Sequence, residues 1–323
     1  MGAIEAVVDD RKKQFIENFI YPSIAFGGIY QNRYLLGTSL ARPCITEGII
    51  QVARHYGAEY IAHGATGKGN DQVRFELTAA CLDPSIKCIA PWRLPEFFNR
   101  FKGRLDLMEY AKTKGFTVAA TPKAPYSIDA NIMHISFESG ILEDPMAPAP
   151  ADMYQLTVGP EKWPDSPEEL SIEIEKGIPI KVTNNSTKQV IEGSVGIFSY
   201  LNDVGGRHGV GRIDITEDRF IGMKSRGVYE TPGGTILFQA VRDLEVVCLD
   251  REVNKIRNSL AQTFSEKVYY GLWFSPEGSY LRRCLNLSQK LVSGKVLLHI
   301  FKGNVYVRGR AATKSLYDQE LVR

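Results

Sequence analysis

The sequence is poor in cysteine, and the cysteines it has are not spaced for pairing. Five occur in 323 residues, an odd number, and none forms a Cys-x-x-Cys pair. This excludes the disulfide framework of a small secreted domain and the usual spacing of a structural zinc site. The five histidines show no metal-ligand spacing either. We therefore expect no metal site and a reducing compartment, which indicates the cytoplasm.

Long apolar runs and an excess of charge of one sign are also missing. No apolar stretch approaches the roughly 20 residues of a membrane helix, and the first ten residues show no signal-peptide pattern. Basic residues number 39 and acidic residues 37, so the formal net charge is only +2. Such a balance creates no strong field toward nucleic acid or an anionic membrane. We predict neither of these as a partner.

The first third of the chain alternates helix and strand signals, which predicts an α/β layer with a parallel sheet between helices. A chain of this length is also long enough for two domains. Two short apolar strands are expected at 60–62 and 86–90. Helices are expected at 14–26, 46–56, 73–81 and 105–114, the second with Ser39 as its N-cap.

The remainder changes to an α+β pattern, and we place the boundary between residues 116 and 117. Alternating segments on either side of turn residues predict two hairpins, with two helices between them. The hairpins are expected at 171–183 and 296–307, and the helices at 196–204 and 250–267. A Pro-rich stretch, 145–167, is either a linker or a long loop within the second domain.

A glycine-rich segment, His63-Gly-Ala-Thr-Gly-Lys-Gly-Asn-Asp-Gln-Val-Arg74, follows a predicted strand and opens a predicted helix. Unpaired N–H groups and the helix dipole at such a junction suit an anion. The segment is not a Walker P-loop, because glycine follows the lysine where Ser or Thr is needed. Asn70, Asp71 and Arg74 share one helical face and together suit an amino-acid zwitterion. The alternative is that Asn70 or Asp71 caps the helix and Arg74 is a surface charge.

Longer strings carry more information than any one of these patterns. They are Tyr34-Leu-Leu-Gly-Thr-Ser-Leu-Ala-Arg-Pro43, the glycine-rich segment through Glu76, Pro91-Trp-Arg, Phe101-Lys-Gly-Arg, Pro125-Tyr-Ser-Ile-Asp, Gly209-Val-Gly-Arg-Ile-Asp-Ile and Arg219-Phe-Ile-Gly-Met-Lys-Ser-Arg-Gly-Val-Tyr-Glu-Thr-Pro232. In this order they resemble the argininosuccinate synthases over essentially the whole chain. The resemblance implies a parallel sheet of the adenine-nucleotide α-hydrolase type in residues 1–116, N-terminally incomplete. An α+β synthetase domain would follow in residues 117–323.

The resemblance further implies an ATP-dependent carbon–nitrogen ligase of arginine biosynthesis and the urea cycle. In the family the ureido oxygen of citrulline attacks the α-phosphate of ATP, which enters with Mg²⁺, and citrullyl-AMP and pyrophosphate form. The amine of aspartate then displaces AMP. No enzyme nucleophile is required, so positioning and charge stabilisation would carry the catalysis. A homotetramer is expected for the family.

Particular side chains inherit roles from the resemblance. Positions that match citrulline contacts are Tyr34, Ser39, Asn70, Arg74, Ser127, Ser136, Glu217 and Tyr229. Positions that match aspartate contacts are Thr66, Asn70 and Asp71, and those that match ATP contacts are His63, Gly64, Ala65, Thr66, Gly67, Lys68, Gly69 and Asn70. Several of these residues also have a purely structural interpretation. Tyr34, Tyr229 and Ser136 could pack in the core, Ser127 and Glu217 could lie in turns, His63 could be a structural histidine, and Lys68 could be a solvated charge. We expect Arg74, Asp71 and Glu217 to be under-paired without ligand.

The chain departs from the family's pattern in four places. It contains no Ser-Gly-Gly-Leu-Asp-Thr-Ser loop for the pyrophosphate of ATP, and only Arg323 follows the string Ser315–Val322, which puts tetramer assembly in question. Ala130 stands where glutamate is usual, and Thr46-Glu47-Gly48 where the family is basic. We expect truncation at both ends and no citrullyl-AMP formation by this chain alone. The alternatives are a non-catalytic amino-acid-binding or assembly paralogue, and a tRNA-thiolating enzyme, which the absent basic patch disfavours.

Overall fold

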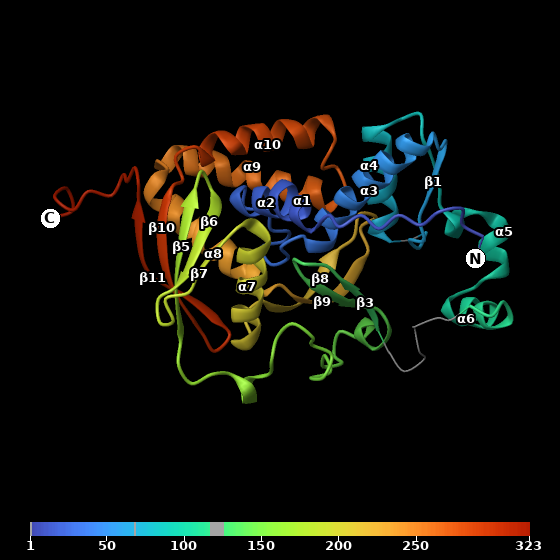
Figure 1. Ribbon diagram of the computed structural model, residues 1–323, viewed down its shortest axis with the longest axis horizontal. Coiled ribbons are helices and arrows are strands. Elements are labelled where there is room, and N and C mark those ends of the chain that lie inside the picture. Colours follow the sequence, from blue (N-terminus) through green and yellow to red (C-terminus); the bar gives the residue numbers. More distant parts are fainter. Residues whose placement is uncertain (1, 68, 117–125) are drawn as a thin grey trace.

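A small parallel layer at one end of the molecule carries the glycine-rich loop (Figure 1). The computed structural model describes residues 2–67, 69–116 and 126–323. The elements of this layer are α3 (Gly37–Tyr56), β1 (Tyr60–Ala62), α4 (Asn70–Leu82), β2 (Lys87–Ile89), the 3-10 turn η2 (Pro91–Arg93), α5 (Pro95–Arg100) and α6 (Arg104–Thr113). Strands β1 and β2 pair in parallel with Ile61 opposite Cys88. The predicted α/β fold is thereby confirmed, and Gly115 ends the last helix at a φ of 70° as expected.

Helix α3 begins nine residues earlier than predicted, which changes the place of Ser39. Leu36, at a φ of 66°, precedes the helix, and the N–H of Thr38 bonds to the Tyr34 hydroxyl at 3.0 Å. Ser39 lies in the first turn and is completely buried, so the prediction that it caps the helix is wrong. Pro43 lies inside the helix and removes the bond to the carbonyl of Ser39. A tyrosine from outside the helix thus replaces the side-chain cap.

The chain between residues 12 and 25 forms one helical rod with a π-helical centre. Its parts are α1 (Lys12–Phe15), the π turn η1 (Ile16–Ile20) and α2 (Tyr21–Ala25). Pro22 lies in the interior of this rod, directly after the π turn, so its missing N–H leaves a carbonyl of the preceding turn without its helical donor. Phe19 and Ile20 are buried with the other apolar side chains of the rod. The single helix predicted at 14–26 therefore exists, but with a widened turn.

A five-stranded antiparallel sheet forms the opposite end of the molecule. Its order is β11-β10-β5-β6-β7. The strands are β5 (Glu168–Glu175), β6 (Ile178–Asn184), β7 (Val190–Glu192), β10 (Gly294–Phe301) and β11 (Asn304–Ala312). Both predicted hairpins are confirmed. Each turns through two residues of positive φ, Lys176-Gly177 at 50° and 79° and Lys302-Gly303 at 44° and 80°.

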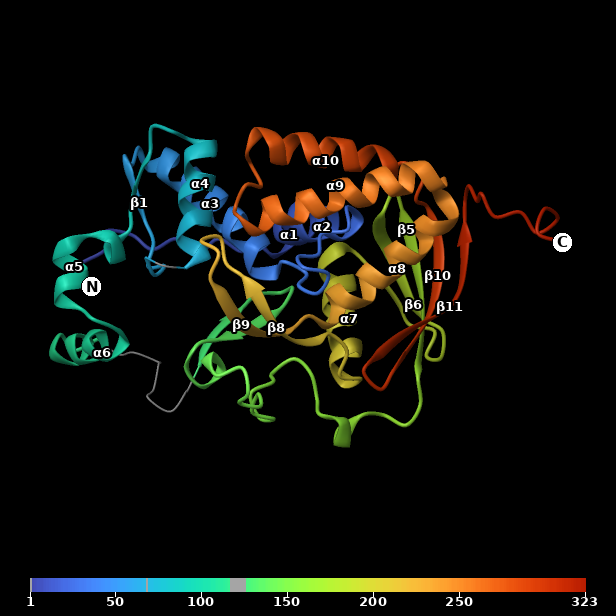
Figure 2. The same cartoon turned by 180° about the vertical axis from the view of Figure 1, so that it is seen from behind.

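A four-stranded antiparallel sheet lies between the two ends (Figure 2). Its order is β3-β4-β9-β8, with β3 (Ser127–Ala130), β4 (Ile135–Glu138), β8 (Arg212–Asp218) and β9 (Lys224–Glu230). The helices of this half are α7 (Ser194–Arg207), α8 (Pro232–Cys248), α9 (Arg251–Tyr269) and α10 (Pro276–Gln289), with short 3-10 turns η3 (Gly140–Glu143) and η4 (Pro160–Lys162). Asp250 caps α9 through the N–H groups of Glu252 and Val253, both at 3.0 Å. The helices predicted at 196–204 and 250–267 are confirmed.

One large apolar core joins the beginning of the chain to its second half. Side chains from Phe15 to Cys44 pack in the same cluster as side chains from Leu170 to Ile300. The parallel layer has a much smaller cluster of its own, centred on Ile50 and Ile61. The rod and the start of α3 are therefore built into the larger body. A division between residues 116 and 117 stays a prediction.

The Pro-rich stretch 145–167 is a long loop of the second half. Glu230 on β9 accepts the N–H groups of Gln155, Leu156 and Thr157 and the Thr157 hydroxyl, at distances between 2.5 and 3.2 Å. The linker alternative is therefore wrong, because these bonds fix the loop on a strand of that half. Among the described residues, no helix is both long and apolar enough to cross a membrane.

Candidate active site

A polar cavity of about 320 Å³ lies where the parallel layer meets the four-stranded sheet. Its lining combines the loop after β1, the first turns of α3 and α4, and strands β3, β4, β8 and β9. The predicted site residues that it brings together are Tyr34, Gly64, Ala65, Thr66, Gly69, Asn70, Asp71, Arg74, Ser127, Ser136, Glu217 and Tyr229. The loop thus faces the second half of the chain, as the sequence predicts. The roles of the individual side chains stay predictions.

Four predicted residues do not belong to this lining as described. Ser39 is completely buried and is not part of the cavity lining, and its Oγ has no hydrogen-bond partner among the described residues. His63 and Gly67 belong to the same loop but are not among the side chains that line the cavity. Lys68 lies outside the described residues. The side chain of Ser39 can therefore support the site only through its position in α3.

Two arginines and two aspartates form a charged network on one wall. Arg42 contacts Asp71 at 2.7 Å and Asp129 at 2.5 Å, and Arg74 contacts Asp71 at 2.8 Å. Burial alone would raise the pKa of Asp71, but the two arginines lower it overall. The expectation of under-pairing is wrong for Asp71, which both arginines contact, whereas Arg74 shares this ion pair and keeps further N–H groups. Arg42 was not predicted, although it stands one helical turn beyond Thr38 in the string that carries the resemblance.

Arg74 is held on three sides and is not a surface charge. Only 4% of the residue is exposed. Besides its bond to Asp71, its Nε donates to the Tyr269 carbonyl at 2.9 Å, and the guanidinium lies 5.0 Å from the centre of the Tyr269 ring. Within the described residues these bonds use two of its five N–H groups, which leaves donors for a carboxylate ligand.

Glu217 is the member of the predicted trio that keeps an open acceptor. Its Oε1 accepts from the Tyr269 hydroxyl at 2.7 Å, whereas Oε2 makes no hydrogen bond of good geometry with the described residues. The residue is 6% exposed, so the exposed-turn alternative is wrong. Burial raises the pKa of its carboxyl, and the Tyr269 bond, Arg74 and the nearby Tyr229 hydroxyl only partly offset that rise. A buried carboxylate with a free oxygen suits an ammonium group.

Asn70 ties the glycine-rich loop to the other side of the cavity. Its Nδ2 donates to the Tyr269 hydroxyl at 2.9 Å, and its Oδ1 accepts from the N–H of Phe220 at 3.0 Å. The N-cap of α4 is Gly69, with no side-chain cap, so the alternative in which Asn70 or Asp71 caps the helix is wrong. The first N–H groups of α4 therefore remain available to an anion.

Tyrosine rings form the apolar part of the lining. The Tyr34 and Tyr229 rings stack with centroids 4.6 Å apart, and Tyr269 meets Tyr34 edge-on at 6.3 Å. Tyr34 and Tyr229 are each 2% exposed, so the core-packing alternative describes their rings. Their residues nevertheless line the cavity. Burial raises the pKa of Tyr34 to about 12, so its hydroxyl stays neutral. Tyr269 was not predicted because its partners lie far away in sequence.

Strands β3 and β4 place two serines and one further carboxylate on the cavity wall. Ser127 pairs with Glu138 across the strands, and Ser136 with Asp129, whose carbonyl accepts from the Ser136 hydroxyl at 3.5 Å. Glu138 was not predicted. The Glu138 side chain is 37% exposed, but partial desolvation and the carboxylates of Glu217 and Asp71 raise its pKa to about 7, and Arg219 at 3.6 Å only partly offsets that rise. A carboxyl group that titrates near neutral pH beside the substrate-sized cavity is suited to proton transfer.

A buried neutral histidine supports the start of α3 behind the cavity. His134 is completely buried, and its Nε2 lies 2.9 Å from the Thr38 hydroxyl. Burial, helped by Arg42, lowers the pKa of His134 to about 3. The ring therefore stays uncharged at neutral pH and acts as a packing and hydrogen-bonding group.

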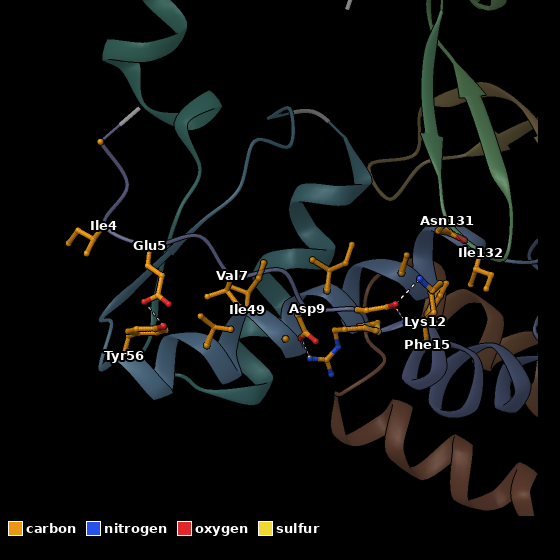
Figure 3. A pocket seen from close by; sticks show the side chains of 18 residues that line it. Ile4, Glu5, Val7, Asp9, Lys12, Phe15, Ile49, Tyr56, Asn131 and Ile132 are labelled. Atoms are coloured by element: carbon orange, nitrogen blue, oxygen red, sulfur yellow. Dashed lines mark hydrogen bonds and ion pairs between the residues drawn. The ribbon is translucent and has the colours of Figure 1, made fainter. Parts of the chain in front are cut away.

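The polar cavity is not the largest hollow described in the structure. A larger cleft of about 1120 Å³ lies between the N-terminal segment and α3, and Figure 3 shows its side chains. Its walls are mainly apolar, with Ile4, Val7 and Ile49 among them, and Glu5 bridges it to the Tyr56 hydroxyl at 2.7 Å. None of the predicted site residues lines it. Convergent polar groups identify the smaller cavity as the functional candidate.

The fold and the cavity agree with the comparison to known proteins. Residues 1–117 match the family model of the arginosuccinate synthase N-terminal HUP domain, and residues 126–323 match that of the arginosuccinate synthase C-terminal domain. The class is therefore a synthase that joins a HUP domain to a synthetase domain. The chain is 55% identical over 322 residues to argininosuccinate synthases of Xenopus laevis and Danio rerio, and 54% identical to that of Homo sapiens. Each match covers 100% of this chain and 78% of the relative. The chain belongs to the argininosuccinate synthase family.

Proposed function

We propose that the cavity between the two halves of this chain is the site at which the family reaction joins citrulline and aspartate with ATP to give argininosuccinate. The expectation that the chain forms no citrullyl-AMP without a Ser-Gly-Gly-Leu-Asp-Thr-Ser loop stays a prediction, which the turnover experiment below tests. The observation that carries the proposal is the convergence in one place of the residues predicted for both amino acids and of the anion-binding loop. In the proposed reaction the ureido oxygen of citrulline attacks the α-phosphorus of ATP and pyrophosphate leaves. The aspartate amine then attacks the activated carbon, AMP leaves, and the nitrogen gives up a proton. Magnesium enters with ATP as part of that substrate.

Arg74 and Glu217 are suited to the two charges of an amino acid. The free N–H groups of Arg74 can donate to an α-carboxylate, and the unbonded Oε2 of Glu217 can accept from an α-ammonium. Because Asp71 and Tyr269 already orient these groups, they need little rearrangement when the substrate binds. Citrulline would then have its ureido end directed toward the loop. Serine hydroxyls from β3 and β4 line the same cavity.

Glu138 is the group best suited to take the proton from the attacking amine. An ammonium cannot attack carbon until it has lost a proton, so an acceptor near the aspartate is required. Glu138 lines the cavity together with Thr66 and Asp71, and its pKa of about 7 lets it accept and release a proton near neutral pH. The groups that face it are Asp71, Glu217, Arg74 and Arg219. We assign the electrostatic positioning to Arg74 and Arg219 and the proton transfer to Glu138.

The binding step tests the assignment of the amino-acid site without requiring ATP. Calorimetric titration of the chain with citrulline should show saturable binding, and Glu217→Gln should weaken it about 10- to 100-fold, because a bond to a charged group is lost. Glu252→Gln is the matched control, since Glu252 is an exposed residue on α9. Equal affinities for the two variants would contradict the assignment.

Turnover distinguishes the proposed enzyme from a protein that only binds amino acids. Release of pyrophosphate that depends on citrulline would report adenylation, and mass spectrometry would detect argininosuccinate after aspartate is added. Binding of both amino acids with neither product would favour the non-catalytic alternative.

Location and assembly complete the proposal. All five cysteines are free, which supports a reducing compartment such as the cytoplasm. The homotetramer implied by the resemblance stays a prediction, which light scattering of the purified chain would test.

A further inference from the structure

A histidine, a glutamate and a cysteine meet beside the glycine-rich loop but outside the substrate cavity. One ligand atom from each of His63, Glu76 and Cys88 lies within 4.8 Å of the other two. They come from the end of β1, from α4 and from β2, so no sequence spacing could reveal them. Parallel pairing sets Cys88 opposite Ile61, and alternation places His63 on the same face of β1 as Ile61. Helix α4 adds the glutamate.

The histidine nitrogen that points into this group is buried and lacks a partner. The side chain of His63 is 5% exposed, and its Nε2 makes no hydrogen bond within the described part of the chain. The Oε1 of Glu76 is 3.8 Å away, which is too far for such a bond. The imidazole stacks on the Phe75 ring at 5.1 Å, so its direction is fixed. A buried polar nitrogen without a partner is costly, and with Nδ1 accepting from Ala65 this nitrogen carries an N–H that no acceptor among the described residues meets.

From this geometry we propose that His63, Glu76 and Cys88 bind one zinc-class divalent cation. Nitrogen, sulfur and carboxylate oxygen form a donor set that suits Zn²⁺, with a fourth position left for water. Bond lengths of about 2.0–2.3 Å place tetrahedral ligands roughly 3.5 Å apart, so the three groups must close by about 1 Å. The Cys88 thiol gives up its proton to the solvent when the cation binds.

Two neighbouring contacts oppose the cation and set the expected affinity. Arg93 contacts Glu76 at 2.9 Å, and Gln72 donates to the same carboxylate at 3.1 Å. Arg93 is largely exposed and can turn into solvent, so breaking its ion pair with Glu76 costs little free energy. We therefore expect reversible binding that exchanges with solution, unlike a structural zinc site.

Occupation of this site would change the glycine-rich loop. The Nδ1 of His63 accepts the N–H of Ala65 at 3.2 Å, which requires that this nitrogen carry no proton. A neutral imidazole that binds a cation through Nε2 carries its proton on Nδ1 instead, so it can no longer accept from Ala65. The N–H of Ala65 is then released at the edge of the substrate cavity. The cation thereby acts as a modulator of the loop.

Cobalt and zinc titrations of the full chain test the proposal. Co²⁺ should produce a thiolate-to-cobalt charge-transfer band with one cation per chain, and Zn²⁺ should abolish it. Cys88→Val removes the sulfur while leaving a residue that suits a strand, and it should remove the band. Glu76→Gln should weaken Zn²⁺ binding at least about tenfold. Cys81→Ser is the control, because Cys81 is an exposed thiol on the same helix as Glu76. A wild-type band that is absent, or that survives in Cys88→Val, would overturn the site.

Hydrogen exchange tests the effect on the loop independently of activity. Zn²⁺ should speed exchange of the Ala65 amide in the wild-type chain and leave it unchanged in Cys88→Val. Circular dichroism and the melting temperature of each variant confirm that it is folded. Zinc binding with no change at Ala65 would refute the coupling to the loop.

Discussion

Replacing Arg74 with leucine tests the two roles that we assign to this residue, one in the fold and one in the site. Arg74→Leu removes the bonds to Asp71 and to the Tyr269 carbonyl together with the contact on the Tyr269 ring. Removing one partner of a buried ion pair costs about 3–5 kcal/mol when the other charge is left alone. Asp71 keeps Arg42 at 2.7 Å, so we expect a smaller loss of roughly 2–4 kcal/mol in the free energy of unfolding.

This loss should lower the melting temperature by roughly 3–6 °C in a chain of this size. Citrulline affinity should fall by about 10- to 100-fold as well, because the donors for its carboxylate are gone. Scanning calorimetry and citrulline titration measure the two quantities on the same sample. Arg251→Leu is the control, since the Arg251 side chain is 83% exposed and, among the residues that the structure describes, pairs only with its neighbour Glu252.

The two measurements can disagree, and each disagreement has a meaning. A large thermal loss with unchanged citrulline affinity would make Arg74 a purely structural residue and remove it from the site. Unchanged melting would contradict the buried ion pair itself. Arg74→Lys keeps the charge without the planar fork, so it should recover more of the stability than of the citrulline affinity.

Three further outcomes are expected. Because the pKa of Glu138 is raised from 4.5 to about 7, its contribution to stability is present below 4.5 and lost as the pH rises to 7. The wild type should therefore lose melting temperature relative to Glu138→Gln, which stays neutral, over that window, and a difference that does not change with pH would contradict the raised pKa. The pKa of His134 is lowered from 6.5 to about 3, so its neutral ring stabilises the fold above pH 6.5. As the pH falls toward 3, the free energy of unfolding should decrease by up to about 4–5 kcal/mol from this residue, and acid unfolding curves of His134→Gln should lack that decrease. Asp250→Ala should lower the free energy of unfolding by about 1 kcal/mol through loss of the α9 cap, whereas Asp250→Asn should nearly preserve it in urea titrations.

Local chemistry made part of the fold predictable. The hairpins at Lys176-Gly177 and Lys302-Gly303 depend on a turn and on alternation within a few residues, and Asp250 stands directly before its helix. The sequence did not predict where α3 starts, because the group that satisfies one of its first N–H groups does not stand at the N-cap position. The Tyr34 hydroxyl replaces the expected serine cap, and Leu36 adopts a conformation that its side chain disfavours.

For the site as well, one part could be predicted from the sequence and another could not. The strings that carry the resemblance contain most of the cavity lining, so its location followed from the sequence. The pairing within it did not, because it depends on contacts across the fold. Tyr269 reaches Arg74 across 195 positions and Glu217 across 52. Whether Arg74 is under-paired could be decided only once these partners were in place.

The shared core also bears on how such a chain can be recombined. Because Phe15, Phe19 and Leu40 pack in one cluster with Leu244 and Phe264, the two segments that match separate family models are not interchangeable cassettes. A crossover between relatives near residue 120 would pair an N-terminal rod from one parent with a C-terminal core from another. Only parents whose side chains agree in volume along that seam would give a well-packed hybrid. Substitutions on the rod and on α8 or α9 should therefore be inherited together, although more than 200 positions of sequence separate them.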